Sequence, residues 1–309
     1  MVRRLIITGS EGLIGRNLLE KLDIFGQNIE IHAVDARPAL QPKNLSVTNH
    51  CLDLTKVNIL KLLESIDPHI VIHLAAQTDV RTSILKPHFD KKINFETTKG
   101  IVDALETLNH TSHLVFANSG GAVYGDVQIG RALRESDERK PTSPYGKHKL
   151  EATNYLKLIS KNSKVTCGIL NFSNIYGSKY DQKSAPYKFM NQVTLGKTLK
   201  VYGDGESVRD WIHVDDAVNA IILATKKISN LEVNISTGVG TSIKSLLKEI
   251  QACTSLTMKV ENLPLNPGEV RHSVLDSTLA RIRLGWEPLT SLRDGLKKMH
   301  VENYGQSRH

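Results

Sequence analysis

Short apolar runs alternate with helical periodicity through the first 175 residues of the chain. The runs read as strands, and the segments between them place apolar residues at the three- and four-residue spacing of amphipathic helices. Strands that alternate with helices indicate βαβ units, and therefore a parallel sheet with helices on both faces and right-handed crossovers. The predicted strands are 5–8, 29–34, 70–74, 114–117 and 165–171, and the predicted helices are 13–25, 54–65, 89–108 and 145–160.

The pattern changes after about residue 175. Glycine, proline and short mixed elements appear, as in Gly203-Asp204-Gly205 and Asn266-Pro267-Gly268. We therefore expect an α/β, Rossmann-type, doubly wound parallel sheet with a smaller C-terminal substrate-binding α/β domain. The boundaries that we predict are residues 1–175 and 176–309, with a segment near 212–238, including Val233–Ile235, returning to the main sheet.

Composition narrows the function classes. The chain has 309 residues, 40% of them apolar, and a net charge of +8. Its Lys and Arg residues are scattered, which argues against nucleic acid and favours an anionic small substrate such as a diphosphate. Three widely spaced cysteines provide neither a disulfide framework nor a metal site. No stretch approaches about 18 apolar residues, so we expect no membrane span and a cytoplasmic protein.

A glycine-rich segment, Thr8-Gly9-Ser10-Glu11-Gly12-Leu13-Ile14-Gly15, lies between the first strand and the first helix. Gly9 permits a tight turn, Gly12 lets the backbone approach a pyrophosphate, and Gly15 lets helix and strand pack closely. The N-terminus of the helix then faces the phosphates. A bare glycine-rich match also fits a plain turn, but its position after a strand and before a helix favours a dinucleotide site.

Asp35 ends the second predicted strand, 20 residues beyond Gly15. A carboxylate there can accept both ribose hydroxyls of NAD, and it would repel the 2′-phosphate of NADP. Arg37 leaves NADP open because an arginine can bind that phosphate, and Asp35 can also be a solvated acid at the end of a strand. We favour NAD.

Tyr145 and Lys149 are four residues apart at the start of a predicted helix, so they share one face. A free tyrosine ionises near pH 10 and is a poor base at neutral pH. A neighbouring cation, together with the positive charge of NAD, favours the phenolate and brings its pKa toward the range of a general acid/base. Such a pair also occurs on ordinary helices; the glycine-rich loop and a hydroxyl upstream strengthen the catalytic interpretation.

The chain resembles the extended short-chain dehydrogenase/reductase family along nearly its whole length, in particular the NAD-dependent nucleotide-sugar epimerases of the UDP-glucose 4-epimerase type. The resemblance rests on many motifs in the same order. They are the glycine-rich segment, Asp53-Leu54, His73-Leu74-Ala75-Ala76-Gln77, Asn94, Ser119-Gly120-Gly121-Ala122-Val123-Tyr124-Gly125, Tyr145 to Lys149, Asn174-Ile175-Tyr176-Gly177, Val201-Tyr202-Gly203-Asp204-Gly205, Arg209-Asp210-Trp211-Ile212-His213-Val214-Asp215-Asp216 and Pro267-Gly268-Glu269-Val270-Arg271.

The resemblance implies roles for individual residues. Ser119, Tyr145 and Lys149 would be catalytic, and Lys149 would also hold the nicotinamide ribose. The implied cofactor-binding residues are Gly9, Glu11, Gly12, Leu13, Ile14, Gly15, Asp35, Asp53 near the adenine, Leu54, Leu74, Ala75, Ala76, Gln77, Asn94, Tyr145, Lys149, and Phe172 and Ser173 beside the nicotinamide. Among the implied substrate-binding residues, Asn174 and Arg209 would touch the diphosphate, and Val201 and Tyr202 would lie near the base. The others are Arg81, Ser119, Gly120, Tyr145, Glu269, Arg271 and Ser273.

Other interpretations remain for Asp53 and Arg209, and one applies to the acidic pair Asp215 and Asp216. Asp53 can cap a helix that starts at Leu54. Arg209 can be a surface salt-bridge partner. Asp215 and Asp216 fit the first turn of a helix better than a catalytic role.

The chain departs from the family pattern at Gly120. Similar epimerases have Ser or Thr four residues before the tyrosine of the Val-Tyr-Gly segment, but here that position is Gly120 and Ser119 comes one residue earlier. We hypothesise that Ser119 supplies the hydroxyl. Related 4,6-dehydratases have an Asp-Glu pair at the same position, so Gly120 and Gly121 argue against dehydration.

Two further positions bear on the substrate. Family members often carry an arginine just before the Pro-Gly-Glu segment, where this chain has Asn266; Arg271 can compensate, or phosphate affinity is lower. Ser273 falls where similar epimerases use residue size to admit or exclude an N-acetyl group, and a small serine suggests room for N-acetylhexosamines.

The expected reaction is therefore inversion at carbon 4 of a nucleotide-linked hexose, with NAD as cofactor, no metal, and a homodimer formed through the helices near 89–108 and 145–160. The alternatives are another NAD-dependent oxidoreductase, dehydratase or epimerase on the same scaffold, and a non-catalytic NAD-binding protein. Net NADH production or consumption would separate the first alternative from a 4-epimerase.

Overall fold

Seven parallel strands form the main sheet of the protein. The structure, a computed structural model, describes residues 3–26, 28–40, 47–126, 131–264 and 270–305. The strands lie in the order β10-β6-β5-β4-β1-β2-β3, and every neighbouring pair is parallel. Their bounds are β1 Arg3–Thr8, β2 Ile29–Asp35, β3 Val47–Cys51, β4 Ile70–His73, β5 Ser112–Ser119, β6 Val165–Phe172 and β10 Leu231–Ile235.

Side-chain alternation along the strands fills two cores, one on each face of the sheet. In β1, Leu5 and Ile7 belong to one cluster of buried residues while Ile6 belongs to the other. Because successive side chains of a strand point to opposite faces, both sets are buried only if helices cover both faces. Helices α1 and α9 contribute to the first cluster, and α2, α5 and α7 to the second.

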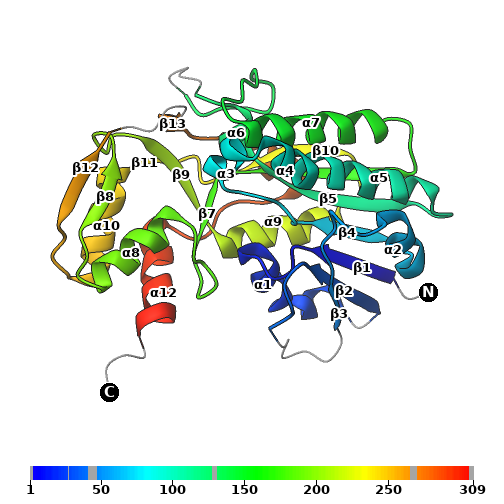
Figure 1. Cartoon of the computed structure of the whole chain (residues 1–309), viewed down its shortest axis with the longest axis horizontal. Coiled ribbons are helices and arrows are strands. Elements are labelled where there is room, and N and C mark those ends of the chain that lie inside the picture. The colour runs from blue at the N-terminus through cyan, green and yellow to red at the C-terminus, as the bar shows by residue number, and fades with distance from the viewer. Residues whose placement is uncertain (1–2, 27, 41–46, 127–130, 265–269, 306–309) are drawn as a thin grey trace.

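Helices cover both faces of the main sheet (Figure 1). On one side lie α1 Leu13–Leu19, the short 3₁₀ helix η1 Leu22–Phe25, α9 Val214–Lys226 and α11 Thr278–Leu284. The other side carries α2 Ile59–Ile66, α3 Val80–Leu85, α4 Pro87–Lys91, the π-helical turn η2 Lys92–Glu96, α5 Thr97–Thr107, α6 Gly120–Val123 and α7 Pro144–Ile159. The doubly wound, Rossmann-type sheet expected from the sequence is confirmed.

Three local predictions need correction. The helix predicted over 13–25 is divided into α1 and η1. The helix predicted over 54–65 begins at Ile59, where the Asn58 side chain caps it, because the Asp53 carboxylate binds the backbone N–H of Thr55 and holds a turn instead. Strand β3, at the edge of the sheet, was not predicted.

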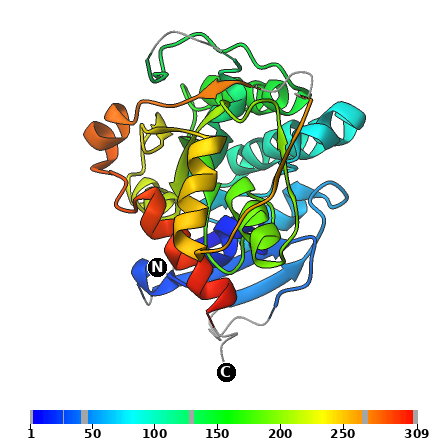
Figure 2. The ribbon, with the colours of Figure 1, turned by 90° about the vertical axis from the view of Figure 1, so that its left-hand side faces the viewer.

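The C-terminal part of the chain builds smaller sheets at one end of the molecule, on the left of Figure 1. Figure 2 views this end, with α10, α12 and α8 in the foreground. Strand β10 joins β6, so the predicted return of Val233–Ile235 to the main sheet is confirmed. The elements at this end are β7 Asn174–Tyr176, β9 Val208–His213, β11 Gly240–Ser242 and β13 His272–Ser273 in one sheet, β8 Leu199–Tyr202 and β12 Val260–Leu263 in another, and helices α8 Ala185–Thr194, α10 Ile243–Thr254 and α12 Leu292–Tyr304.

The chain order defines where a ligand can bind. From β1 the chain moves outward to β2 and β3, and then returns to the opposite side of β1 as β4. In open parallel sheets, such a reversal opens a crevice beyond the carboxyl ends of the two central strands. The segments that follow β1, β4, β5 and β6 all emerge at this edge, and they carry most of the residues that the sequence singled out.

Candidate functional site

The glycine-rich loop takes the tight conformation that a phosphate-binding turn requires. Gly9 has φ +70°, and a Cβ there would lie 2.6 Å from the backbone nitrogen of Ala75. A Cβ on Gly15 would lie 2.5 Å from the carbonyl oxygen of Gly9, so only glycine lets α1 pack against the loop. Gly12 is the N-cap of α1 and has no side chain to cap it, which leaves N–H groups of the first turn for a ligand.

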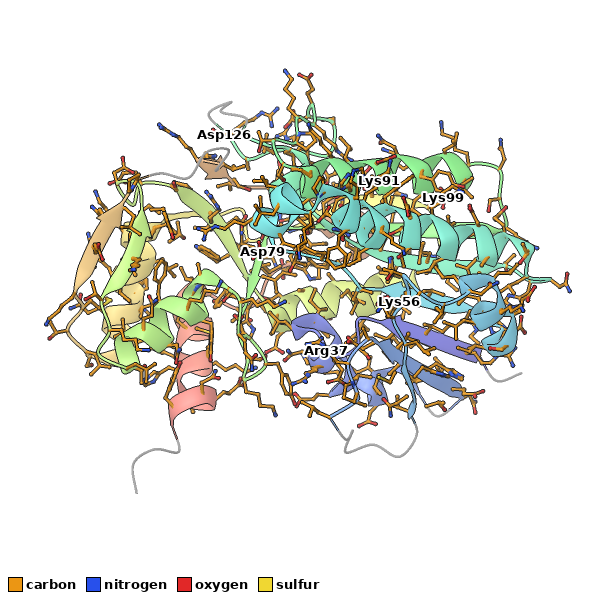
Figure 3. All side chains as sticks on the ribbon, viewed as in Figure 1. Arg37, Lys56, Asp79, Lys91, Lys99 and Asp126 are labelled. Carbon is orange, nitrogen blue, oxygen red and sulfur yellow. The ribbon has the colours of Figure 1, made fainter. Side chains whose placement is uncertain are left out.

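Asp35 lies at the end of β2 with its carboxylate held on two sides. It accepts hydrogen bonds from the backbone N–H of Glu11 (2.9 Å) and of Arg37 (2.9 Å), and the Arg37 guanidinium pairs with it at 3.1 Å. Burial raises the pKa of Asp35, but the hydrogen bonds from Arg37 and Glu11 outweigh burial and the pKa is lowered overall. Figure 3 shows Arg37 beside the N-terminal elements α1 and β2. Asp35 is thus a fixed anion beside the loop, and Arg37 is paired with it.

The segment after β4 is fixed against the loop by a buried histidine. His73 Nδ1 lies 2.7 Å from the Thr8 hydroxyl and its Nε2 lies 3.0 Å from the Thr98 hydroxyl. The Thr8 hydroxyl also accepts the N–H of Ala75 at 3.2 Å. Burial, with the charge of Lys149, lowers the pKa of His73 to about 3, so the ring is neutral. This network places Leu74-Ala75-Ala76 at the crevice, where the sequence predicted that they line a dinucleotide.

A fully buried carboxylate joins the next two predicted cofactor residues. Asp90, on α4, accepts hydrogen bonds from the side-chain amides of Gln77 (2.7 Å) and Asn94 (3.0 Å), and its other oxygen lies 2.7 Å from Nδ1 of His148. Asn94 also donates to the carbonyl of Gln77 at 2.9 Å. Gln77 and Asn94 therefore hold the wall of the crevice through Asp90, a residue that the sequence analysis did not single out.

Tyr145 and Lys149 face the carboxyl end of β5 from the first turns of α7. Ser143 caps the helix, and Gly146 lets it approach α6 closely, since a Cβ there would lie 2.5 Å from the carbonyl of Ala122. Tyr145 and Lys149 are both buried. The Lys149 ammonium donates to the carbonyl of Ala117 at 2.6 Å. The predicted pair thus lies on one helix face, against the strand that ends at Ser119.

Burial dominates the ionisation of this pair. Desolvation raises the pKa of Tyr145 to about 12, against a smaller lowering by a hydrogen bond with Ser119. Desolvation lowers the pKa of Lys149 to about 7, against the opposing charge of Asp90. Without a ligand, Tyr145 is therefore a neutral phenol at pH 7, and the pKa of Lys149 lies close to that pH. Ionisation of Tyr145 requires positive charge brought to the site.

The structure separates the roles of the two glycines after Ser119. A Cβ on Gly120 would lie 2.4 Å from the end of the Leu275 side chain and 3.3 Å from the carbonyls of Asn171 and Phe172, so a side chain at this position would require Leu275 to move. Ser119 forms the hydrogen bond to Tyr145 instead. A Cβ on Gly121 would lie 3.2 Å from the Ser273 hydroxyl, which brings Ser273 to the same corner of the site.

Phe172 and Ser173 end β6 next to this corner. Both are buried, and Ser173 donates from its hydroxyl to the Asp210 carboxylate at 3.3 Å. Asp210 also accepts from the backbone N–H of Thr237 and of Gly238. Asp210 therefore ties β6, β9 and the segment after β10 together. Asp215 and Asp216 lie in the first turn of α9, as the sequence predicted.

A pocket of about 300 Å³ lies between β7, β9 and the start of α8 and contains two predicted substrate residues, Asn174 and Arg209. Arg209 is anchored by donating to the carbonyl of its neighbour Val208 at 2.9 Å. Trp211 also lines the pocket, and β7 pairs with β9 so that Asn174 stands opposite it. Lys183 lines this pocket too. No role was predicted for Trp211 or Lys183, because their placement depends on strand pairing and helix packing that no short motif encodes.

The other predicted substrate residues are distributed around the two parts of the fold. Arg81, on α3, lies over the ring of Tyr202 on β8, with its guanidinium carbon 5.0 Å from the ring centre. The Val201 side chain is buried in the apolar core at this end. Arg271 is exposed, and its backbone N–H donates to the carboxylate of Asp126, which Figure 3 shows beside β13. Glu269, and Asn266 with it, lie outside the described residues.

Asp53 and Leu54 follow β3. Asp53 accepts from the N–H and the hydroxyl of Thr55, and these bonds lower its pKa. It does not cap a helix at Leu54, which leaves the predicted role near the adenine as the proposal for this residue. Leu54 packs against the core on the α2 side.

No group of three or more His, Cys, Asp or Glu suited to a metal ion occurs among the described residues, and no helix in the same ranges is long and apolar enough to cross a membrane.

Comparison with known proteins supports the same interpretation. The family model "NAD dependent epimerase/dehydratase family" matches residues 5–238. A UDP-glucose 4-epimerase of Mycolicibacterium smegmatis is 29% identical over 306 residues, which cover 96% of both chains. The structure of a Thermotoga maritima UDP-glucose 4-epimerase with UDP-glucose aligns with TM-score 0.91 and 29% identity, covering 99% of this chain and 100% of that one. A Thermus thermophilus UDP-glucose 4-epimerase in complex with NAD aligns with TM-score 0.90 and 26% identity, covering 98% and 99%.

The fold and the loop, crevice and Tyr–Lys pair define a Rossmann-type dinucleotide-dependent enzyme. The match over residues 5–238 makes the assignment more specific: the chain belongs to the NAD-dependent epimerase/dehydratase family.

Proposed function

We propose that this protein is an NAD-dependent 4-epimerase of a nucleotide-activated hexose or N-acetylhexosamine, with UDP as the carrier nucleotide. The observation that carries the proposal is the cluster at the carboxyl end of β5, where Tyr145 and Lys149 are buried and Ser119 is half-buried. Gly121, two residues after Ser119, connects this cluster to the pocket of Asn174 and Arg209, because a Cβ on Gly121 would lie 3.6 Å from the Asn174 amide oxygen. A general acid/base, a cofactor and an anion-binding pocket are what this reaction requires.

The dinucleotide site fits NAD. The turn at Gly9 and the close contact at Gly15 leave room for a pyrophosphate but not for a side chain. Asp35 offers carboxylate oxygens for two ribose hydroxyls, and Arg37 is paired with that carboxylate. Bound NAD would supply the hydride acceptor and a positive charge beside Tyr145.

The residues of the chain would then divide the work at carbon 4. Tyr145 accepts the proton of the 4-hydroxyl, and Ser119 hydrogen-bonds the same oxygen. Lys149, in its charged form, stabilises the phenolate of Tyr145. The 4-keto sugar turns over within the site, anchored by its diphosphate at Asn174 and Arg209, and Tyr145 returns the proton when the opposite face is reduced. The sugar is epimerised and the cofactor ends as it began.

Dehydration on the same scaffold is disfavoured. Removal of water across two carbons requires a further acid and base near the sugar. Here the two positions after Ser119 are Gly120 and Gly121, and the first of them faces packed atoms. The reaction therefore ends at epimerisation.

A product assay tests the proposal. Purified protein with catalytic NAD is incubated separately with UDP-glucose and UDP-N-acetylglucosamine, and proton NMR follows the anomeric signals. We expect the galacto epimer to appear with no net NADH. Net NADH would indicate an oxidoreductase instead, and no new signal from either sugar would refute the UDP-hexose assignment.

We also propose that the enzyme works as a cytoplasmic homodimer that pairs through α5 and α7. The three cysteines are unpaired thiols, which suits a reducing compartment. Leu158 on α7 is 65% exposed, and a partner helix would cover it. Sedimentation equilibrium with Leu158→Glu tests the interface: we expect the wild type at twice the monomer mass and the variant shifted toward monomer.

A further inference from the structure

The pocket between β7, β9 and α8 is built for an anion. Its lining includes two cations, Lys183 and Arg209, and none of the described lining residues is acidic. The start of α8 also lines the pocket, through the N-cap Ser184 and the first helical residue, Ala185. The positive end of a ten-residue helix adds to the field of the two side chains.

Two polar atoms at this pocket have no partner within the protein. They are Nε1 of Trp211 and Oδ1 of Asn174. Trp211 is only 6% exposed, so its N–H is shielded from bulk water. A buried donor without an acceptor is costly, and a ligand with oxygen acceptors would remove that cost. The Trp211 N–H is therefore evidence, apart from charge, that the pocket takes a ligand with acceptor oxygens. The Asn174 amide oxygen is itself an acceptor and requires a ligand donor such as a hydroxyl.

Asp181 determines where Lys183 lies. Asp181 is only 2% exposed, and its carboxylate accepts hydrogen bonds from the backbone N–H groups of Gly177 (3.0 Å), Lys183 (3.1 Å) and Ser184 (3.0 Å), as well as from the Ser184 hydroxyl. The carboxylate is thus engaged by the turn before α8 and does not pair with the Lys183 ammonium. Among the described residues, no hydrogen bond or ion pair engages that ammonium, although it lines a pocket.

We propose that Lys183 is a specificity-determining residue that binds the diphosphate of the nucleotide sugar, together with Arg209 and the N-terminus of α8. This inference rests on the proposed function, because it assigns the anionic part of that substrate to this pocket. A diphosphate carries charge on both phosphoryl groups, and two cations on different elements can each take one group. Lys183 then provides the positive charge that Asn266 does not.

The test measures ligand binding rather than turnover alone. NAD-loaded protein is titrated with UDP by calorimetry, and binding of uridine, which lacks the phosphates, is followed by ligand-observed NMR. Lys183→Ala should weaken UDP binding about tenfold, as expected for loss of one charged hydrogen bond, and leave uridine binding unchanged. Lys183→Arg should retain most of the affinity. Added salt should narrow the difference between wild type and Lys183→Ala.

A second lysine on the same helix provides the matched control. Lys188 is exposed on α8 and does not line the pocket. Lys188→Ala should bind UDP as the wild type does, and the thermal midpoints of all variants should agree. The inference is overturned if Lys183→Ala binds UDP like the wild type, if UDP and uridine binding fall by the same factor, or if wild-type protein does not bind UDP.

Parallel assays keep the two proposals separate. If wild-type protein epimerises a UDP-sugar while Lys183→Ala binds UDP normally, only the role of Lys183 fails. If wild-type protein turns over neither sugar but Lys183→Ala loses UDP affinity selectively, the diphosphate site stands and the proposed reaction fails.

Discussion

At the carboxyl edge of the seven-stranded sheet, most polar side chains are held by one another: His73 by Thr8 and Thr98, and Asp90 by Gln77, Asn94 and His148. The amide oxygens of Asn94 and Asn118 are exceptions. In the pocket between β7, β9 and α8, the Trp211 N–H and the Asn174 amide oxygen lack partners, and no described acid pairs with the Lys183 ammonium.

The difference suggests a division of labour. Groups that must keep one geometry through a reaction are fixed in advance by internal hydrogen bonds, which lowers the reorganisation required when substrate arrives. Groups that only hold a substrate can leave their hydrogen-bonding capacity for it. Substitutions in the first region should therefore act mainly on kcat, and those in the second mainly on KM.

Tyr145→Phe should give the largest loss. The variant removes one oxygen from a buried side chain and leaves the ring, so folding and NAD binding should persist. Loss of the acid/base should lower kcat about 10³-fold with little change in KM. Initial rates by NMR, with bound NAD measured after denaturation, check this result. A kcat within tenfold of wild type would remove Tyr145 from the chemistry.

Lys149→Met should separate activity from stability. Folding lowers the pKa of Lys149 from 10.5 to about 7, so between these values the unfolded chain binds the additional proton. The free energy of unfolding of NAD-free wild-type protein should therefore rise with pH from about 7 to about 10.5. In Lys149→Met, this contribution to the slope should vanish.

The same variant should also be more stable at neutral pH, by roughly 1–4 kcal/mol, because an apolar side chain of similar length replaces a buried amine. Its kcat should fall about 10²-fold. Urea unfolding across this pH range, with turnover measured in parallel, checks both parts. Lower stability together with lower activity would mean that Lys149 is mainly structural.

Ser119→Ala should reduce kcat by about 10–100-fold, since one hydrogen bond to the reacting oxygen and to Tyr145 is lost. Gly120→Ser tests the same assignment from the other side. It places a hydroxyl where similar epimerases have one, but its Cβ meets Leu275 at 2.4 Å, so it should destabilise the protein and not rescue Ser119→Ala. Unchanged turnover in Ser119→Ala would refute the role of Ser119.

How much of this could be predicted depends on whether a feature is local in sequence. The turn at Gly9, the close contact at Gly15 and the shared face of Tyr145 and Lys149 each lie within one short segment, so spacing alone predicted them. The edge strand β3 was missed because its residues, Val47–Cys51, are mostly polar and partly exposed and show no apolar run.

Other site residues depend on tertiary contacts. Asp90 and His148 meet across α4 and α7, 58 residues apart. Trp211 reaches the pocket only because β9 pairs with β7, and Lys183 because Asp181 holds the turn before α8. Such convergence is set by packing between elements, which periodicity and motif spacing do not encode.

Ser273→Tyr should change the selectivity between UDP-N-acetylglucosamine and UDP-glucose. Ser273 is 3% exposed and lies beside Gly121, so a large ring there would project toward the sugar. We expect kcat/KM for UDP-N-acetylglucosamine to fall about tenfold relative to that for UDP-glucose. Competition between the two sugars in one NMR tube measures the ratio directly. Equal losses for both sugars would indicate disruption of the site rather than exclusion of the acetyl group.

Trp211→Phe should have the smallest effect and the one most specific to the pocket. The variant keeps an aromatic ring in the core but removes the unpartnered N–H. If that N–H serves only to bind substrate, its loss should raise KM for the UDP-sugar about 3–10-fold, the value of one hydrogen bond, and leave kcat unchanged. Because the free protein never satisfied this group, removing it offsets part of the cost of the smaller ring, and unfolding measurements should show a loss below that of a typical tryptophan truncation. Steady-state rates over a range of substrate concentrations decide the matter: a fall in kcat at constant KM would place Trp211 with the pre-organised groups of the first region and break the contrast between the two.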